Sequence, residues 1–228
     1  MSHTRLWATH VLYQVVIKQQ HLKQALAQNV PNLATDQDSA WIQHACYVTL
    51  RYHFSLQSRW QKFIDKPLKD KWLAQLLTLS LGQKFFMNTP DHAIVNEAIK
   101  VAKKNKKGWA SGLINKVLRL AMNDDEFQPQ DETTQYEHPG WWIDLLKKDW
   151  PQHYQNILRA SNQKPPLWIR SRNPKQTFDG TQHHSIKTAW LMNDEQASIG
   201  SDLLAGQYSV QDAAAQLAAE ILEPQTGE

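Results

Sequence analysis

Basic side chains gather in one short stretch of this sequence, from residue 100 to residue 119. The stretch holds seven lysines and arginines and no acidic residue: Lys100, Lys103, Lys104, Lys106, Lys107, Lys116 and Arg119. Side chains of this type neutralise phosphates, and each such contact releases counterions from a nucleic acid, which gives salt-sensitive and largely sequence-independent affinity. The stretch predicts a surface for a polyanion. A solvated lysine loop beside a core helix explains the same residues.

A second candidate group lies near residue 170, where residues 167–171 alternate as a strand does. Arg170 and Arg172 fall on one side of that strand, and Trp168 falls on the same side. Charge beside an aromatic ring offers a base a surface on which to stack, although an edge strand decorated for solubility has the same pattern. Arg51, near the end of a predicted helix, is expected to share one basic face with the lysines and Arg119.

The residues that catalysis would need are sparse. The single cysteine, Cys46, lies inside a predicted helix, where a structural role is expected. His183 and His184 are adjacent, so on a strand they would point to opposite faces, which is poor geometry for binding one metal. The carboxylate pairs Asp124–Asp125 and 194–195 lie in polar loops, and no glycine-rich phosphate loop or nucleophile elbow is visible. We therefore expect no catalytic, metal-binding or cofactor-binding residue in this sequence.

Composition and charge narrow the class of protein. The chain has 228 residues, of which 41% are hydrophobic, and one cysteine, which excludes an internal disulfide and fits a reducing cytoplasm. No signal peptide or membrane-spanning run of apolar residues is visible, so we expect a cytoplasmic protein without a membrane partner. Residues 1–119 hold 17 Lys and Arg against 6 Asp and Glu, a balance of +11, whereas residues 120–228 hold the other 8 against 16, a balance of −8. This asymmetry suggests two modules, the first suited to nucleic acid.

The first module is predicted to be all-helical over residues 1–122. Apolar periodicity predicts helices over 5–30, 36–51, 53–64 and 71–86, with Thr35 capping the second and Gly82 allowing a close helix approach. Thr89 is expected to cap the next helix, with Pro90 as its first residue. The last helix carries the lysine run at its start, and Ile114, Val117, Leu118 and Ala121 form its apolar stripe.

The second module is predicted to be small and mixed. Residues 123–139 form an acidic segment that we interpret as an exposed linker, since 123–138 hold six acidic residues and no lysine or arginine. Two short helices are expected at 140–148 and 152–160, followed by strands at 167–171, 186–191 and 208–210 and a helix at 211–221. The predicted fold class is mainly α: a helical bundle followed by a small α/β subdomain over 140–228.

Several stretches resemble known sequences. Residues 47–51 (YVTLR), 90–98 (PDHAIVNEA) and 112–119 (GLINKVLR) resemble the NusB-like RNA-binding domain. Residues 138–142 (HPGWW), 162–170 (NQKPPLWIR) and 208–217 (YSVQDAAAQL) resemble later segments of the bacterial 16S rRNA 5-methylcytosine methyltransferase family, called RsmB, Sun or Fmu. The six stretches follow the family's order over nearly the whole chain. The resemblance implies a NusB-like bundle followed by a small RRM-like subdomain.

The resemblance also implies a function. The chain would be the RNA-binding, substrate-recognition part of a small-subunit rRNA cytosine methyltransferase, with roles in rRNA processing and ribosome biogenesis. Residues 224–228 (PQTGE) resemble the segment before the family's S-adenosylmethionine loop. The resemblance therefore implies that the cofactor and the catalytic cysteines belong to a methyltransferase domain that this truncated chain lacks, and that this domain is a partner for the chain to contact. Between Arg172 and Trp190 the chain is shorter than the family, so a helix is expected to be lost there. The alternative function is a NusB-type transcription antitermination factor, which binds RNA but needs none of residues 140–228.

Overall fold

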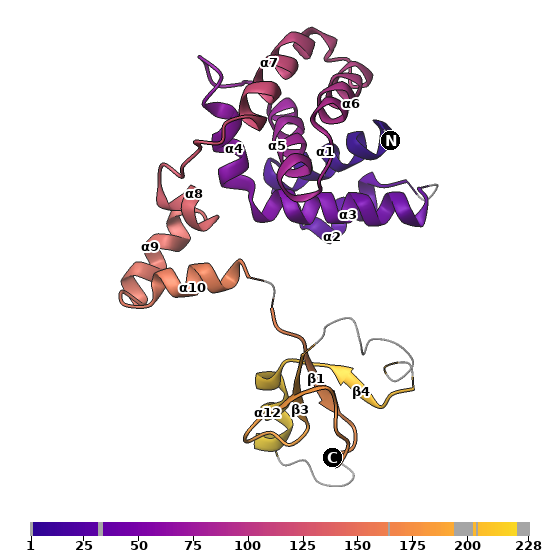
Figure 1. Cartoon of the computed structure of the whole chain (residues 1–228), viewed down its shortest axis with the longest axis vertical. Helices are drawn as coiled ribbons and strands as arrows, with labels where there is room; N and C mark the ends of the chain where they lie inside the picture. Colours follow the sequence, from indigo (N-terminus) through magenta and orange to yellow (C-terminus); the bar gives the residue numbers. More distant parts are fainter. Residues whose placement is uncertain (1, 32–33, 164, 194–202, 204, 223–228) are drawn as a thin grey trace. The chain divides into compact units, whose positions relative to one another are not determined.

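The computed structural model describes residues 2–31, 34–163, 165–193, 203 and 205–222. The chain forms two compact units, Met1–Asn162 and Gln163–Glu228 (Figure 1). The first unit is built from helices, and the second contains a four-stranded sheet. This architecture confirms the predicted fold class, a helical bundle followed by a small α/β subdomain. Two features noted in the sequence lie outside the described residues: the carboxylate pair at 194–195 and the family motif at 224–228.

The first unit is organised around α5, which spans Lys71–Phe86 as predicted. Every residue from Trp72 to Gln83 is buried, and α5 packs against five other helices of the bundle (Figure 1). A helix that is buried on all sides needs apolar residues all round, which explains why no single stripe dominates its sequence. The bundle consists of α1 (Ser2–Val16), α2 (Leu22–Asn29), α3 (Asp36–Arg51), α4 (His53–Gln61), α5, α6 (Asp91–Lys104), the short 3-10 helix η1 (Gly108–Ala110) and α7 (Ser111–Met122).

Helix ends follow the local chemistry of the chain in most places. The Thr35 hydroxyl accepts from the backbone N–H of Asp38 at 3.1 Å, which confirms the predicted cap of α3. The predicted cap at Thr89 is wrong, because Pro90 occupies the N-cap position of α6 and no side chain caps that helix. The single helix predicted over 5–30 is also wrong. It divides into α1 and α2, and Gln19 between them adopts a left-handed backbone with φ 55°.

Two features of the packing were predicted correctly. A Cβ atom at Gly82 would stand 2.7 Å from the Thr49 hydroxyl oxygen, so the absence of a side chain lets α3 and α5 approach closely. Ile114, Val117, Leu118 and Ala121 on α7 are fully buried, which confirms the phase of the predicted stripe. Asn115, Lys116 and Arg119 are exposed on the opposite face of that helix, so α7 presents its basic residues to solvent.

The prediction of an exposed linker over 123–139 is wrong for its second half. Asp131 caps a short helix, α8 (Glu132–Tyr136), and Tyr136 is buried. The helices α9 (Gly140–Asp149) and α10 (Tyr154–Ser161) follow as expected, and α8 packs against α4. The sequence analysis grouped residues 140–162 with the sheet, whereas in the structure they belong to the first compact unit.

The second unit contains β1 (Trp168–Ser171), β2 (Gly180–Gln182), β3 (Ala189–Met192) and β4 (Tyr208–Val210). The strands are antiparallel in the order β2-β3-β1-β4, and Ile169 of β1 lies opposite Trp190 of β3. The helix α12 (Ala213–Leu222) packs against β1 and β3. β2 was not predicted, and β3 begins at Ala189 rather than at residue 186. Residues 172–188, all of them described, contain no helix, as the short spacing suggested. Among the residues that the model describes, no helix is long and apolar enough to cross a membrane.

Candidate nucleic-acid interface

The lysine run forms the connection between α6 and α7. Helix α6 ends at Lys104, and Lys106 adopts a left-handed backbone with φ 57°. The turn is closed by backbone hydrogen bonds, from the N–H of Lys107 to the Ala102 carbonyl at 2.8 Å and from the N–H of Lys106 to the Lys103 carbonyl at 3.1 Å. Lys103, Lys104 and Lys106 are exposed around this turn. The short connection therefore concentrates three cations at one end of the bundle.

Lys107 has a different role from the other lysines of the run. Its ammonium group forms an ion pair with Asp70, the N-cap residue of α5, and lies 6.0 Å from the centre of the Trp72 ring. Burial opposes ionisation of Asp70, but the hydrogen bonds from Lys107 and Leu73 and the charge of Lys107 lower the pKa of the Asp70 carboxyl. Lys107 thus attaches the connection to the start of α5, and its charge is already partly neutralised.

An exposed tryptophan that the sequence analysis missed lies within the basic stretch. Trp109 belongs to η1 and is 67% exposed, while its neighbour Ala110 is fully buried. A flat aromatic surface beside exposed cations is the combination on which single-stranded nucleic acids bind, because bases stack on the ring while the cations contact phosphates. The available signal was an aromatic residue immediately after a run of lysines and a glycine.

The basic face continues onto α7. Lys116 and Arg119 are both exposed, and the Arg119 Nε donates to the Asn115 side-chain oxygen at 2.8 Å. This bond joins residues one helical turn apart and holds the guanidinium along the surface of α7. Lys116 also lines a shallow pocket of about 270 Å³ together with Leu68 and Leu113. Two further predicted RNA-binding residues therefore lie on the helix that the lysine run introduces.

The structure does not bring Arg51 to this surface. Arg51 is exposed at the end of α3, and the next residue, Tyr52, stacks on Phe86 at the carboxyl-terminal end of α5 with ring centres 4.0 Å apart. Lys107 instead contacts Asp70 before the first turn of α5. A helix of 16 residues is about 24 Å long, so Arg51 and the lysine run lie by opposite ends of α5. The expected single face does not include Arg51, and its contact with RNA stays a prediction.

The β1 group is only partly arranged as expected. Arg170 and Arg172 are exposed and line one hollow of about 540 Å³ beside β4. Trp168 is half-buried: it packs against the cluster of Ile186, Ala189 and Ala213, and its ring lies edge-on to His183. Within the described residues the side chains of the two arginines have no bonded partner, whereas the Trp168 ring already contacts the protein and offers a base little free surface.

The groups considered for catalysis have structural surroundings. Cys46 is fully buried, its thiol donates to the Ala8 carbonyl at 3.8 Å, and burial raises the pKa of the thiol to about 12. His183 and His184 both follow β2 in a loop, so the opposite-face geometry expected for a strand does not apply to them, and their ring centres lie 4.5 Å apart. The His183 Nδ1 accepts from the backbone of Ile186 at 3.1 Å. Among the described residues, no group of three or more His, Cys, Asp or Glu could hold a metal ion.

Two family models match the chain. Residues 2–123 match the NusB family, and residues 138–182 match the family described as Methyltr_RsmF/B-like, ferredoxin-like domain. The chain therefore belongs to the NusB family, with a ferredoxin-like methyltransferase-associated domain after the bundle. Both matches confirm the resemblance indicated by the motifs. The second match begins at residue 138, so it includes α9 and α10 although these helices pack in the first compact unit.

Two curated relatives share one description. The ribosomal RNA small subunit methyltransferase B of Vibrio vulnificus is 34% identical over 245 residues, which cover 98% of this chain and 57% of that protein. The protein of the same description from Vibrio cholerae is 35% identical over 255 residues, covering 100% of this chain and 57% of its own length. The chain thus spans a little over half the length of these relatives. The solved structure of PH0851 aligns with the whole chain and 57% of its own at a TM-score of 0.58 and 13% identity, which shows a shared fold.

Proposed function

We propose that this chain binds RNA through the α6–α7 connection, and that it recognises small-subunit ribosomal RNA as substrate for a cytosine methyltransferase. The observation that carries the proposal is the clustering of exposed Lys103, Lys104 and Lys106 with the exposed Trp109 in a NusB-family bundle. The cations supply affinity for phosphates, and the indole supplies a stacking surface. The rRNA substrate class is supported by the two relatives described as ribosomal RNA small subunit methyltransferase B.

The alternative, a transcription antitermination factor of the NusB type, is less well supported. Such a factor needs only the helical bundle, whereas residues 138–182 match a domain associated with RsmF/B-like methyltransferases. We assign to the described residues the role of docking the RNA. S-adenosylmethionine, which the methyltransferase resemblance implies, does not fit them: their sheet is antiparallel throughout and has no parallel strand-to-helix crevice of the kind that holds nucleotide cofactors.

The test compares two double variants of the full chain. Lys103→Gln with Lys106→Gln removes two exposed cations from the connection, and Lys18→Gln with Lys23→Gln removes two exposed cations from α2 and the segment before it. Both variants change the net charge equally. If each connection lysine contacts a phosphate of a single-stranded rRNA fragment, the slope of log affinity against log salt should flatten by about 1.4, at about 0.7 per contact. The Lys18/Lys23 variant should keep the slope of the unmodified chain.

Fluorescence anisotropy over a series of salt concentrations measures both quantities, and thermal melts establish that the variants remain folded. Lys107 is left intact because its ion pair with Asp70 makes it part of the structure. Equal slopes for the two double variants would show that the connection is only solvated. A Trp109→Leu variant should weaken binding to single strands more than binding to a duplex, since paired bases cannot stack on the ring.

A further inference from the structure

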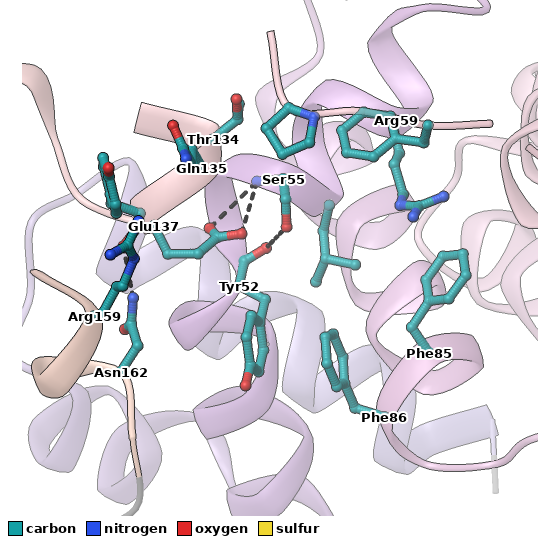
Figure 2. A pocket seen from close by; sticks show the side chains of 14 residues that line it. Tyr52, Ser55, Arg59, Phe85, Phe86, Thr134, Gln135, Glu137, Arg159 and Asn162 are labelled. Atoms are coloured by element: carbon teal, nitrogen blue, oxygen red, sulfur yellow. Dashed lines mark hydrogen bonds between the residues drawn. The ribbon is translucent and has the colours of Figure 1, made fainter. Parts of the chain in front are cut away.

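A cavity of about 610 Å³ opens in the first unit between the helices α4 and α5 and the chain that includes α8 and α10 (Figure 2). Its size falls in the range of small-ligand sites, about 300–1,000 Å³. Six of its lining residues come from the bundle, and the others follow α7: Tyr52, Ser55, Leu56, Arg59, Phe85 and Phe86, then Phe127, Pro129, Thr134, Gln135, Tyr136, Glu137, Arg159 and Asn162. The cavity was not predicted from the sequence, because residues 123–139 were expected to form an exposed linker.

One wall of the cavity is aromatic. Tyr52 and Phe86 stack in parallel with ring centres 4.0 Å apart and an angle of 9° between planes, and Phe86 remains 39% exposed. The guanidinium of Arg59 lies 4.4 Å from the centre of the Phe85 ring and 4.3 Å from that of Phe127. Arg59 also donates to the Asp124 carbonyl at 3.0 Å, so its contacts are taken up by the protein. The wall therefore offers flat ring surfaces rather than a free charge.

The other wall carries four polar side chains, two of which have no hydrogen bond to the described residues. Figure 2 shows Arg159, Asn162, Gln135 and Glu137 on the side away from Phe85 and Phe86. Arg159 is exposed and its guanidinium lies over the Tyr136 ring at 5.7 Å, but within the described part of the chain this guanidinium forms no hydrogen bond or ion pair. The Gln135 side-chain amide is likewise exposed and unbonded among these residues. A cation and an amide thus face an aromatic wall across one cavity.

The carboxylate of Glu137 does not cancel the Arg159 charge. It accepts hydrogen bonds from the backbone N–H groups of Phe54 at 3.0 Å and Ser55 at 3.2 Å, in the first turn of α4. The positive end of a helix dipole stabilises an anion placed there. Because Glu137 is occupied in this way, the guanidinium of Arg159 is the charge that the cavity presents to a ligand.

We propose that this cavity binds one unpaired nucleotide of the RNA, with the base against the Tyr52–Phe86 stack and the phosphate at Arg159. The inference rests on the proposed function. A nucleotide combines a flat aromatic ring with an anionic group in a single small ligand, which matches the two walls. The Gln135 amide can both donate and accept, so it can contact the edge of a base. The cavity and the α6–α7 connection lie by opposite ends of α5, about 24 Å apart, so the chain would select RNA whose unpaired nucleotide lies at about that distance from the segment bound by the connection.

Two RNAs and three variants test the inference in the full chain. The probes are a single-stranded heptamer with one central 2-aminopurine, whose fluorescence falls when it stacks, and a blunt RNA duplex. The variants are Phe86→Leu, which keeps apolar volume but removes the ring, Arg159→Gln, and the control Lys23→Gln, which removes an exposed charge that does not line the cavity. Loss of one stacked base should weaken heptamer binding about tenfold for Phe86→Leu. Arg159→Gln should flatten the salt slope by about 0.7.

In both cavity variants the 2-aminopurine signal should be lost or reduced, while duplex affinity and melting temperature stay at control values. Heptamer binding equal to that of Lys23→Gln would overturn the inference. So would an equal loss for heptamer and duplex, because it would indicate a general effect on the RNA surface. In either case the salt slope of the Lys103→Gln/Lys106→Gln variant still tests, independently of the cavity, whether the α6–α7 connection binds RNA. Failure of the unmodified chain to bind either RNA would overturn the proposed function and this inference together.

Discussion

Two leucines of α7 allow a matched test of how the bundle is held together. Leu118 is fully buried in the main core, whereas Leu120, two residues further along the same helix, is 43% exposed. Replacing each by alanine makes the same chemical change in the same helix. Because leucine and alanine both favour helices, the intrinsic helix propensity changes little. The difference between the two variants therefore measures burial.

The expected magnitude follows from the position of Leu118. The substitution removes three buried carbon atoms, which at about 0.8 kcal/mol per methylene amounts to about 2.4 kcal/mol of lost transfer free energy. The cavity that remains adds up to about 2 kcal/mol, depending on how far the neighbours relax. Leu118→Ala should thus lower the free energy of unfolding by about 2.5–4.5 kcal/mol. Leu120→Ala should lower it by less than about 1 kcal/mol, as expected for a surface position.

Urea unfolding of the full chain, followed by far-ultraviolet circular dichroism, reports mainly on the first unit because most of the helices lie there. The midpoint should fall strongly for Leu118→Ala while the slope against urea stays constant, since the surface exposed on unfolding is unchanged. A loss under 1 kcal/mol for Leu118→Ala, or equal losses for the two variants, would refute the assigned phase of α7. That phase also determines which residues of α7 face the proposed RNA surface.

Two further predictions concern other helix contacts. Gly82→Ala should destabilise the bundle by about 1–3 kcal/mol through its clash with the Thr49 hydroxyl, and adding Thr49→Ala should restore part of the loss. The control in urea melts is Gly112→Ala, because a Cβ atom at Gly112 would meet open space. Equal losses of unfolding free energy for Gly82→Ala and Gly112→Ala would exclude the clash. Burial raises the pKa of the Glu137 carboxyl despite its hydrogen bonds to α4. A carboxyl with a raised folded-state pKa loses its proton more easily in the unfolded chain than in the folded one. The contribution of Glu137 to the free energy of unfolding should therefore fall as pH rises from the unfolded-state pKa through the raised folded-state pKa. Glu137→Gln should remove that fall in a series of urea melts at different pH. Parallel curves of unfolding free energy against pH for the variant and the unmodified chain would contradict the raised pKa of Glu137.

The helix bounds and the helix cap that were predicted correctly depend on interactions within one helix. The bounds of α5 were predicted because its apolar run is long and Pro67 and Pro90 flank it. The Thr35 cap joins residues only three apart, so its chemistry is legible in the chain itself. The break between α1 and α2 was missed because Gln19, a residue that seldom adopts positive φ, makes the turn in place of glycine.

The segment after α7 was misread because its order depends on distant residues. Acidic composition without lysine or arginine is typical of a solvated linker. Composition does not show, however, which groups elsewhere in the chain could pair with the carboxylates. Glu137 accepts from the backbone of Phe54, 83 residues earlier in the chain. Asp131 caps α8 within its own segment, and this Asp-x-x-Thr pattern was the one local signal for the helix. Recognition of the cavity required both observations, so sequence alone could not predict it.

The lysine run shows which property of the candidate site could not be predicted from the sequence. Sequence identified which residues are cationic, but not which of them already have partners. Lys107 pairs with Asp70, 37 residues away, and so supports the structure, while Lys103 and Lys106 remain exposed one turn apart. An alanine scan that treated the run as one surface would mix a loss of stability with a loss of binding. The structure instead centres the proposed interface on Lys103, Lys106 and Trp109, with Lys107 holding that connection against the start of α5.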